Sequence, residues 1–306
     1  MKIMQIFSLS SILIFSLISV AFITLLERKI LGYMQIRMGP NKVGPMGIMQ
    51  PFSDAIKLYS KEMNWPAQSN SIPFFISPCM SLSLALMMNL TLPYLKPLMN
   101  LKLALLMFLS ILGLGVYPIL ISGWSSNSNY SLIGSMRALA QTISYEVSLV
   151  FIILSLMFLT SSLSFYSIFL TQKMFMFFMF LVSFTLWLFS SVAELNRTPF
   201  DFTEGESELV SGFNTEYSSS SFAIIFMAEY LMILIFSMIT SVLFINSNIN
   251  LLSMLKIMGF MFFYIWIRAT LPRYRYDKLM NLSWKMILPT ATFNLFFSIM
   301  LTIYSK

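Results

Sequence analysis

Long apolar runs alternate with shorter polar segments along almost the whole chain. A helix of about 20 residues crosses the hydrocarbon core of a bilayer and satisfies its own backbone hydrogen bonds there. We therefore predict an all-α membrane protein, a single multi-pass domain over 1–306, with a bundle of about eight transmembrane helices at 3–26, 72–94, 101–122, 139–160, 173–193, 218–244, 252–270 and 284–304.

The first long polar segment has a period of its own. Between Ile48 and Met63, apolar residues recur every three or four positions, and polar residues occupy another face. This spacing predicts an amphipathic helix that lies at the membrane interface. Gly-Pro pairs at 39–40 and 44–45 indicate turns before it.

Basic residues predict the orientation. We expect the loops 27–70, 123–138, 194–217 and 271–283 to face inward. These loops and the adjoining helix ends, to 268 and 285, hold thirteen of the nineteen Lys and Arg residues. Positively charged loops stay on the cytoplasmic or matrix side. An even number of crossings then places both termini on the opposite side, and the inward loops form one docking surface.

The apolar run at the N-terminus is predicted to be a retained helix. It extends from Ile3 to Leu26, which is longer than the apolar core of a signal peptide. It ends in the charged residues 27–29 without a small-residue cleavage site.

Composition excludes several kinds of site within this chain. Of its residues 58% are hydrophobic and 10% are charged; there is no His and one Cys. A His general base, a His-ligated haem or zinc, and a four-Cys iron–sulfur cluster are therefore excluded. Cys79 lies in an apolar segment and is expected to serve packing. The net charge of +7 does not indicate nucleic-acid binding, because its carriers flank the apolar runs.

Acidic residues are rare and concentrated. Six of the twelve Asp and Glu residues lie between 193 and 217, namely Glu194, Asp201, Glu204, Glu206, Glu208 and Glu216. Close carboxylates shift one another's pKa values apart, so such a cluster at a membrane boundary predicts a place where protons are handled. A solvated acidic loop is the alternative. Apolar neighbours such as Phe200 and Phe202 favour a packed loop instead.

Two further acids lie inside predicted membrane helices. Glu146 follows Arg137, Gln141 and Tyr145, which share a helix face. Glu229 lies about 18 Å along its helix, with no basic residue within two turns in sequence. A carboxylate at a helix centre costs roughly 2.5–3.5 kcal/mol, so such acids are expected to be functional. We predict a proton relay; a structural ion pair is the alternative for Glu146.

Four blocks of sequence resemble a known family. They are ERKILGYMQIRMGPNKVGPMGIMQPFSDAIKL (27–58), RALAQTISYEVSL (137–149), AELNRTPFDFTEGESELVSGFNTEY (193–217) with FMAEY (226–230), and RATLPRYRYDKLM (268–280) with WK (284–285). In order and spacing they resemble subunit 1 of the proton-pumping NADH:ubiquinone oxidoreductase, respiratory complex I. The resemblance covers the whole chain. It departs at Leu195, where Thr is expected, and at Met38, where many members have Lys; neither change removes an acid or a key arginine.

The resemblance implies a subunit of the mitochondrial inner membrane that has no redox centre, metal or catalytic residue of its own. Its inward loops would dock the peripheral arm, whose subunits carry the flavin and iron–sulfur clusters. It would form most of the tunnel for the substrate ubiquinone. Matching positions make the following residues candidates for that tunnel: Glu27, Arg28, Arg37, Asp54, Lys57, Arg197, Phe226 and Arg273.

The resemblance also implies an acidic funnel that couples quinone reduction to proton translocation. Its candidate residues are Arg137, Tyr145, Glu146, Glu194, Asp201, Glu204, Glu206, Glu208, Glu216 and Glu229. Two unit charges 4 Å apart interact by about 4 kcal/mol at an effective dielectric of 20. This equals about three pKa units, which is enough to switch the protonation of a neighbour.

Three other functions fit parts of the pattern. A membrane subunit of a ferredoxin-linked dehydrogenase or hydrogenase would share the bundle and the acidic loop. The 26 Met and 30 Phe residues resemble an organelle coding bias and argue against it. A stand-alone proton or cation transporter would use intramembrane acids but does not need crowded inward loops. A purely structural anchor leaves Glu146 and Glu229 unexplained.

Overall fold

The computed structural model describes residues 2–94, 101–171, 180–202, 205, 210–245 and 251–304, and all regular elements in these ranges are helices. Seven of the described helical segments are long and apolar enough to cross a membrane. The helix α9 (Leu181–Glu194) is apolar but shorter, and residues 172–179 before it lie outside the described ranges. The predicted all-α membrane class is confirmed, with a helix count close to eight.

The bounds of the elements are as follows. In chain order they are α1 (Lys2–Met34), η1 (Pro45–Gly47), α2 (Gln50–Ser60), α3 (Ser71–Leu90), α4 (Ala104–Leu114), α5 (Val116–Ser125), α6 (Asn129–Thr160), α7 (Phe165–Thr171), α9 (Leu181–Glu194), η2 (Gly212–Asn214), α11 (Ser219–Thr240), η3 (Ser241–Ile245), α12 (Leu251–Thr270), α13 (Tyr276–Leu282), η4 (Ser283–Ile287) and α14 (Leu288–Tyr304).

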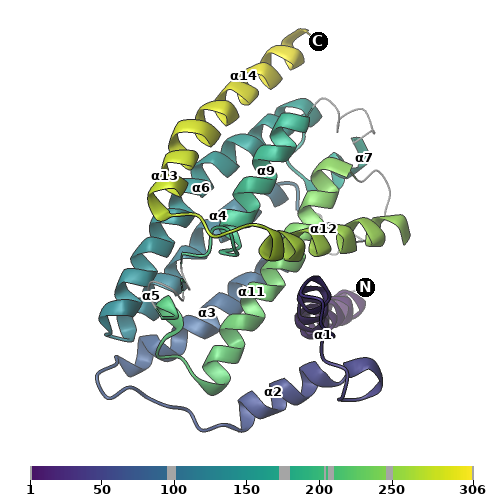
Figure 1. Ribbon diagram of the computed structural model, residues 1–306. Coiled ribbons are helices and arrows are strands. Elements are labelled where there is room, and N and C mark those ends of the chain that lie inside the picture. The colour runs from purple at the N-terminus through teal and green to yellow at the C-terminus, as the bar shows by residue number, and fades with distance from the viewer. Residues whose placement is uncertain are drawn as a thin grey trace.

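The centre of the bundle is formed by α6 and α11. In their most apolar stretches 56% of residues are buried, against at most 33% in the other spans. α6 packs against α5, α9 and α14, and α11 packs against α3 (Figure 1). The view shows α1 nearly end-on while α3, α6 and α11 run obliquely across it, so α1 is strongly inclined to the central helices.

Several boundaries differ from those expected. α6 begins at Asn129 rather than 139, so the expected loop 123–138 is reduced to 126–128. α1 extends to Met34, and the charged residues 27–29 lie inside it rather than at its end. Polar residues do not end these helices because their side chains find partners in the bundle. The expected span 101–122 is divided at Gly115 into α4 and α5.

The amphipathic helix expected within 48–63 is present as α2. Its apolar side chains Phe52, Ile56 and Tyr59 are exposed in the isolated chain. Gln50 Nε2 donates to Asp54 Oδ1 at 3.1 Å across one turn of the helix.

Connections that were predicted to share one face touch one another. The backbone N–H of Asn70 donates to Ser125 O at 2.9 Å, and Asn127 Nδ2 donates to Gln68 O at 3.2 Å. These bonds join the segment after α2 to the turn between α5 and α6. The N–H of Tyr274 donates to Pro199 O at 3.0 Å, which joins the segment before α13 to the segment after α9.

Glycine allows close approach of another backbone segment to α6. A Cβ atom on Gly134 would lie 2.9–3.0 Å from backbone atoms of Gly212 and Phe213. η2 therefore packs directly on the α6 backbone. In membranes, helix association depends on such close van der Waals contact because lipid is as apolar as the side chains.

We expect Gly134→Ala to lower the thermal stability of the detergent-solubilised protein, because the new methyl group meets backbone atoms that cannot move aside. Overpacking of this kind costs about 1–3 kcal/mol. The matched control is Gly259→Ala in α12, where a Cβ has no neighbour within 4 Å. That variant should be as stable as the parent or more so. Equal melting temperatures for both variants would contradict the packing of η2 on α6.

Candidate functional site

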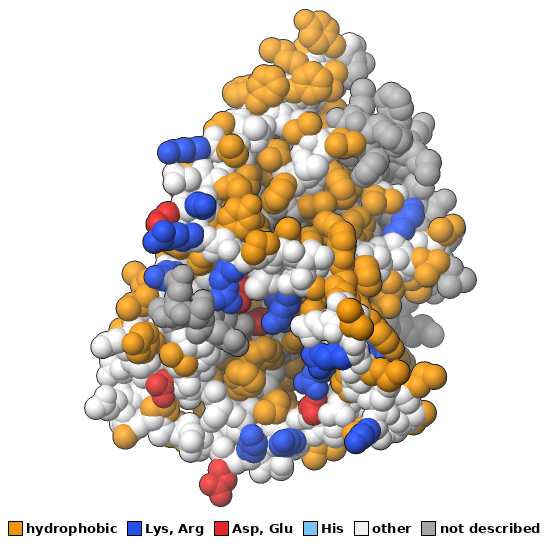
Figure 2. All heavy atoms as spheres, viewed as in Figure 1, with side chains coloured by type: hydrophobic (Ala, Val, Ile, Leu, Met, Phe, Trp, Pro, Cys, Tyr) orange, Lys and Arg blue, Asp and Glu red, His pale blue; other side chains and the backbone are white. Residues whose placement is uncertain are grey.

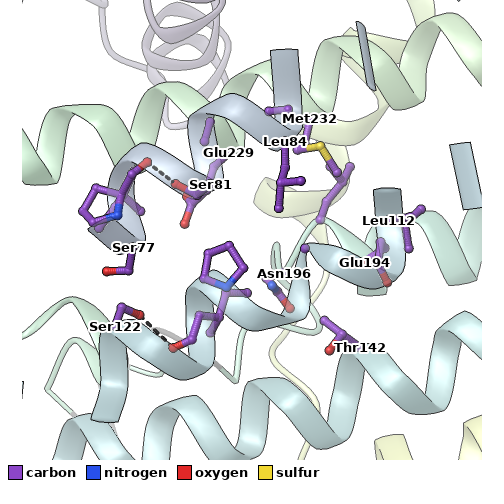
Figure 3. Close-up of a pocket in the computed structure, with 18 of the residues that line it drawn as sticks. Ser77, Ser81, Leu84, Leu112, Ser122, Thr142, Glu194, Asn196, Glu229 and Met232 are labelled. Atoms are coloured by element: carbon purple, nitrogen blue, oxygen red, sulfur yellow. Dashed lines mark hydrogen bonds between the residues drawn. The ribbon is translucent and has the colours of Figure 1, made fainter. Parts of the chain in front are cut away.

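A cavity of about 120 Å³ lies between α3, the α4–α5 break, α6, α9 and α11. Two of the predicted acids, Glu194 and Glu229, line it (Figure 3). Most of the remaining lining is apolar. The other polar side chains around it are Ser77, Ser81, Ser122, Thr142 and Asn196.

The hydroxyl groups around the cavity have a common geometry. Ser81 donates to Pro78 O at 2.8 Å, Ser122 to Ile119 O at 2.7 Å and Thr142 to Ala138 O at 3.1 Å. Each hydrogen is thus directed to a carbonyl in the preceding turn of the same helix. The oxygen lone pairs remain available to accept hydrogen bonds from a molecule in the cavity.

Glu194 ends α9 at one side of the cavity. Its carboxylate is buried, and its Oε2 atom has no hydrogen-bond partner among the described residues. Glu146 on α6 lies close enough to interact with it electrostatically. Gly113 on α4 lies beside Glu146, since a Cβ there would be in ordinary contact, 3.9 Å from Glu146 Oε2.

A buried ion cluster lies on the other side of Glu229. Arg197 Nη1 is 3.7 Å from Glu27 Oε1, and Arg197 Nη2 is 3.7 Å from Glu229 Oε2. Arg268 on α12 forms a second ion pair with Glu27. Glu27 is only 4% exposed, so its charge requires these partners. The cluster joins α1, α11, α12 and the segment after α9.

Tyr230 completes this cluster. Its ring lies under the guanidinium of Arg197, with 4.6 Å from Cζ to the ring centroid. Its hydroxyl group lies close enough to Glu27 and Arg197 to interact with both. A cation over an aromatic face is worth up to about 2 kcal/mol when it is desolvated, so Tyr230 helps to hold Arg197 between the two acids.

Two outer ion pairs flank the cluster. Arg28 Nη1 lies 2.5 Å from Asp54 Oδ2 and ties α1 to α2. Arg273 Nη2 lies 3.1 Å from Asp201 Oδ2 and ties the segment before α13 to the acidic loop. In Figure 2, Lys and Arg side chains gather on this face between α13 and α2, with Asp and Glu among them, while hydrophobic side chains dominate around α14.

The beginning of the acidic loop is held by α6. Gln141 Nε2 donates to Ala193 O and to Phe200 O, both at 2.8 Å. The Phe200 ring packs against Tyr145 and Tyr274, with centroids 6.2 and 5.6 Å away. These contacts support a packed loop, as the apolar residues in it predicted. They also give Tyr145 a packing role.

The other predicted residues are distributed as follows. Arg37 and Lys57 are exposed, and Arg37 donates to Gln35 at 2.8 Å. Phe226 is half-buried and packs against Phe222. Arg137 borders a shallow hollow with Tyr276, and Glu216 is half-buried ahead of α11. The acids Glu204, Glu206 and Glu208 lie outside the described residues.

Sequence reasoning missed part of the site. In the sequence, Arg268 is one of the thirteen basic residues that predict orientation, and nothing marks it as part of a site. Tyr230 ends the FMAEY block but is not a predicted site residue. The hydroxyl groups of Ser77 and Ser81 carry no recognisable pattern, because serine is frequent throughout the apolar runs. Across the described residues no group of three or more His, Cys, Asp or Glu could hold a metal ion.

Comparison with known proteins identifies the family. A family model described as NADH dehydrogenase matches residues 7–299. The chain belongs to this family. It is 54% identical to NADH-ubiquinone oxidoreductase chain 1 of Aedes aegypti, over 94% of this chain and 93% of that protein. The protein of the same name from Anopheles quadrimaculatus is 52% identical, over 99% and 97%. The one from Phascolarctos cinereus is 49% identical, over 89% of each chain.

These matches confirm the family resemblance of the four blocks and the expectation of an enzyme subunit. In this member of the NADH dehydrogenase family, the charged residues of the buried ion cluster come from three of those blocks. Glu27 belongs to the first, Arg197 and Glu229 belong to the third, and Arg268 belongs to the fourth.

We expect Glu27 and Arg197 to be strongly coupled in a double-mutant cycle. Glu27→Gln leaves Arg197 with Glu229 as its one remaining partner, and Arg197→Met leaves Glu27 with Arg268 alone. Breaking a buried ion pair costs about 3–5 kcal/mol, and the remaining partner should keep each single loss at or below that range. The double variant removes both charges, so its loss of stability should fall short of the sum by roughly 0.5–3 kcal/mol. Thermal inactivation of the detergent-solubilised assembly measures this.

The control cycle uses Arg275→Gln and Asp277→Asn. Their side chains are 3.9 Å apart but 80% and 76% exposed. Solvent screens such a pair, so the two changes should be additive. Additive effects at Glu27 and Arg197 as well would show that the buried pair does not form.

Proposed function

We propose that this chain is the membrane-arm subunit of a proton-translocating NADH:ubiquinone oxidoreductase that forms the ubiquinone tunnel and the acidic funnel. The family relationship and the full-length similarity to chain 1 proteins support this assignment. The subunit lies in the mitochondrial inner membrane with both termini on the intermembrane-space side. Its partners are ubiquinone, the peripheral-arm and neighbouring membrane-arm subunits and the lipid bilayer; nucleic acid is not one of them. The flavin and iron–sulfur clusters belong to other subunits.

The quinone chamber is formed where α1, α2 and α11 meet. Arg28 and Asp54 tie α1 to α2 at its border. Phe222, Phe226 and Tyr230 form a row of aromatic rings along α11, with successive centroids 4.3 and 6.5 Å apart. This row of aromatic rings can bind the apolar tail of a ligand, and the charged groups beside it can donate hydrogen bonds to a polar head.

The observation that carries the coupling function is the position of Arg197. It contacts Glu27 and Glu229 at the same distance, 3.7 Å, and Glu229 lines the cavity. Reduction of a quinone to a quinol takes up two protons and therefore changes the charge at the chamber. Protonation of Glu27 would weaken its hold on Arg197 and strengthen the pairing of Arg197 with Glu229.

The cavity carries that change further into the bundle. Glu229 and Glu194 both line it, and Glu194 interacts with Glu146. Coupled carboxylates share their protons, so a change at one alters the occupancy of the next. At an effective dielectric of 20, charges 4 Å apart shift one another by about three pKa units. We therefore propose that the charge change passes from Glu27 through Arg197 to Glu229, and from there through Glu194 to Glu146.

We expect Glu229→Gln to reduce proton translocation and coupled NADH:ubiquinone activity at least about tenfold in the assembled complex, because Gln can neither pair with Arg197 nor carry a proton. NADH oxidation by a water-soluble acceptor that bypasses the quinone should be unchanged. The matched control is Glu62→Gln, since Glu62 is exposed beyond α2. Near-normal pumping in the Glu229 variant would exclude this acid from the relay.

We also expect an azido-ubiquinone to label this chain within residues 27–64 or 197–230. Membranes that contain the assembled complex would be illuminated with the probe, and labelled peptides would be mapped. A quinone-site inhibitor should suppress the label. If only neighbouring subunits are labelled, the tunnel does not run through this chain, although the proton relay would still stand.

A further inference from the structure

A buried tyrosine hydroxyl lies at the end of the cavity where α3 and α11 begin. Tyr217 precedes α11 and is 5% exposed. Its ring stacks on Phe74 with 4.2 Å between centroids and 3° between planes. Its hydroxyl oxygen lies 2.9 Å from Ser77 Oγ. Ser77 is part of the cavity lining, so Tyr217 is the next polar group outward from the cavity.

These two hydroxyls have two complete hydrogen-bond patterns. In one, Tyr217 donates to Ser77 and Ser77 donates to Phe74 O at 3.4 Å. In the other, Ser77 donates to Tyr217 and Tyr217 donates to Phe74 O at 3.3 Å. Burial raises the pKa of Tyr217 above its usual value, so the phenol keeps its proton at neutral pH. Proton transfer starts from the first pattern: Tyr217 accepts a proton from outer water and passes its own to Ser77, and Ser77 releases its own proton to water in the cavity. Both hydroxyls are neutral before and after this step, and rotation of the two O–H bonds restores the starting pattern.

The next step inward leads to Glu229. Ser81 follows Ser77 by one helical turn and also lines the cavity. Ser81 and Glu229 each lie ten residues past the first residue of their helix, at the same depth of about 15 Å. α3 and α11 are packed side by side, and Figure 3 shows Ser81 and Glu229 at the same side of the cavity. Water in the cavity of about 120 Å³ would span the remaining gaps.

Residues next to Tyr217 in the chain carry side-chain hydroxyl groups without a hydrogen-bond partner among the described residues. Thr215 Oγ1, Ser218 Oγ and Ser219 Oγ are buried and have no hydrogen-bond partner among the residues that the structure describes. Buried polar groups are normally satisfied by protein or by ordered water. Three such hydroxyls within five residues favour water at this point, between Tyr217 and the surface at the beginning of α11.

We propose that Tyr217 and Ser77 form a proton inlet that connects the inward aqueous side directly with the cavity at Glu229. The relay would then draw protons from the aqueous phase as well as from the quinone chamber. This inference rests on the proposed function, because it supplies the source of protons for the same acids. Tyr217 and Ser77 are positioning and transfer groups, and neither touches the quinone.

The test compares Tyr217→Phe and Ser77→Ala in the assembled complex. Tyr217→Phe keeps the ring on Phe74 and removes the hydroxyl; Ser77→Ala removes the acceptor at the cavity. Each change interrupts the chain of hydroxyl groups, so proton transfer at this point becomes slow. We expect the initial rate of proton translocation to fall about fivefold or more in both variants, with a larger solvent deuterium isotope effect. Azido-ubiquinone labelling and NADH oxidation by a water-soluble acceptor should stay unchanged.

The control is Tyr94→Phe. Tyr94 donates to Asn89 Oδ1 at 2.7 Å near the other end of α3 and does not line the cavity. This variant should pump protons at the parent rate with an unchanged isotope effect. If one inlet variant fails to assemble, the other decides the matter. Parent-like pumping in an assembled Tyr217→Phe or Ser77→Ala variant would contradict the proposed inlet. If Glu229→Gln abolishes pumping all the same, the proposed relay through Glu229 still holds.

Discussion

Two carboxylates from helices far apart in the sequence, Glu27 on α1 and Glu229 on α11, share the guanidinium group of Arg197. Desolvating a charge costs several kcal/mol unless a partner of opposite sign and hydrogen bonds compensate for it. The surrounding structure therefore has to deliver all of these groups to one point. Arg268 supplies a second cation for Glu27, and Tyr230 supplies a ring for Arg197. This requirement explains why α1 meets α11 and α12 at this level of the bundle.

The same requirement acts on the segment that carries Arg197. That segment begins directly after α9. Gln141 fixes its position by donating hydrogen bonds to the carbonyl groups of Ala193 and Phe200, one on each side of Arg197. The Phe200 ring then lies between Tyr145 and Tyr274. In a bilayer, apolar burial adds little to helix association, so hydrogen bonds and close packing hold such a loop in place. Precise placement of Arg197 is thus a consequence of contacts made by uncharged residues.

Placed in this way, Glu229 faces two environments. On one side it meets Arg197, and on the other it borders a small cavity with hydroxyl groups and Glu194. The proposed proton relay depends on this placement, because the interaction of Glu229 with Arg197 falls with the distance between their charged groups.

The sequence alone determined the membrane class, the amphipathic helix α2 and the family, because apolar run length, helical period and the four sequence blocks are properties of neighbouring residues. It also singled out Glu194 and Glu229 as candidates, because acids are rare in this chain. It did not determine where α6 begins, since Asn129 to Ala138 become helical through packing against η2 and α5. It also did not reveal Arg268, Tyr230, Ser77 or Tyr217 as partners of the site. Their contacts join residues up to 241 positions apart, and only the tertiary structure brings such groups within hydrogen-bonding distance.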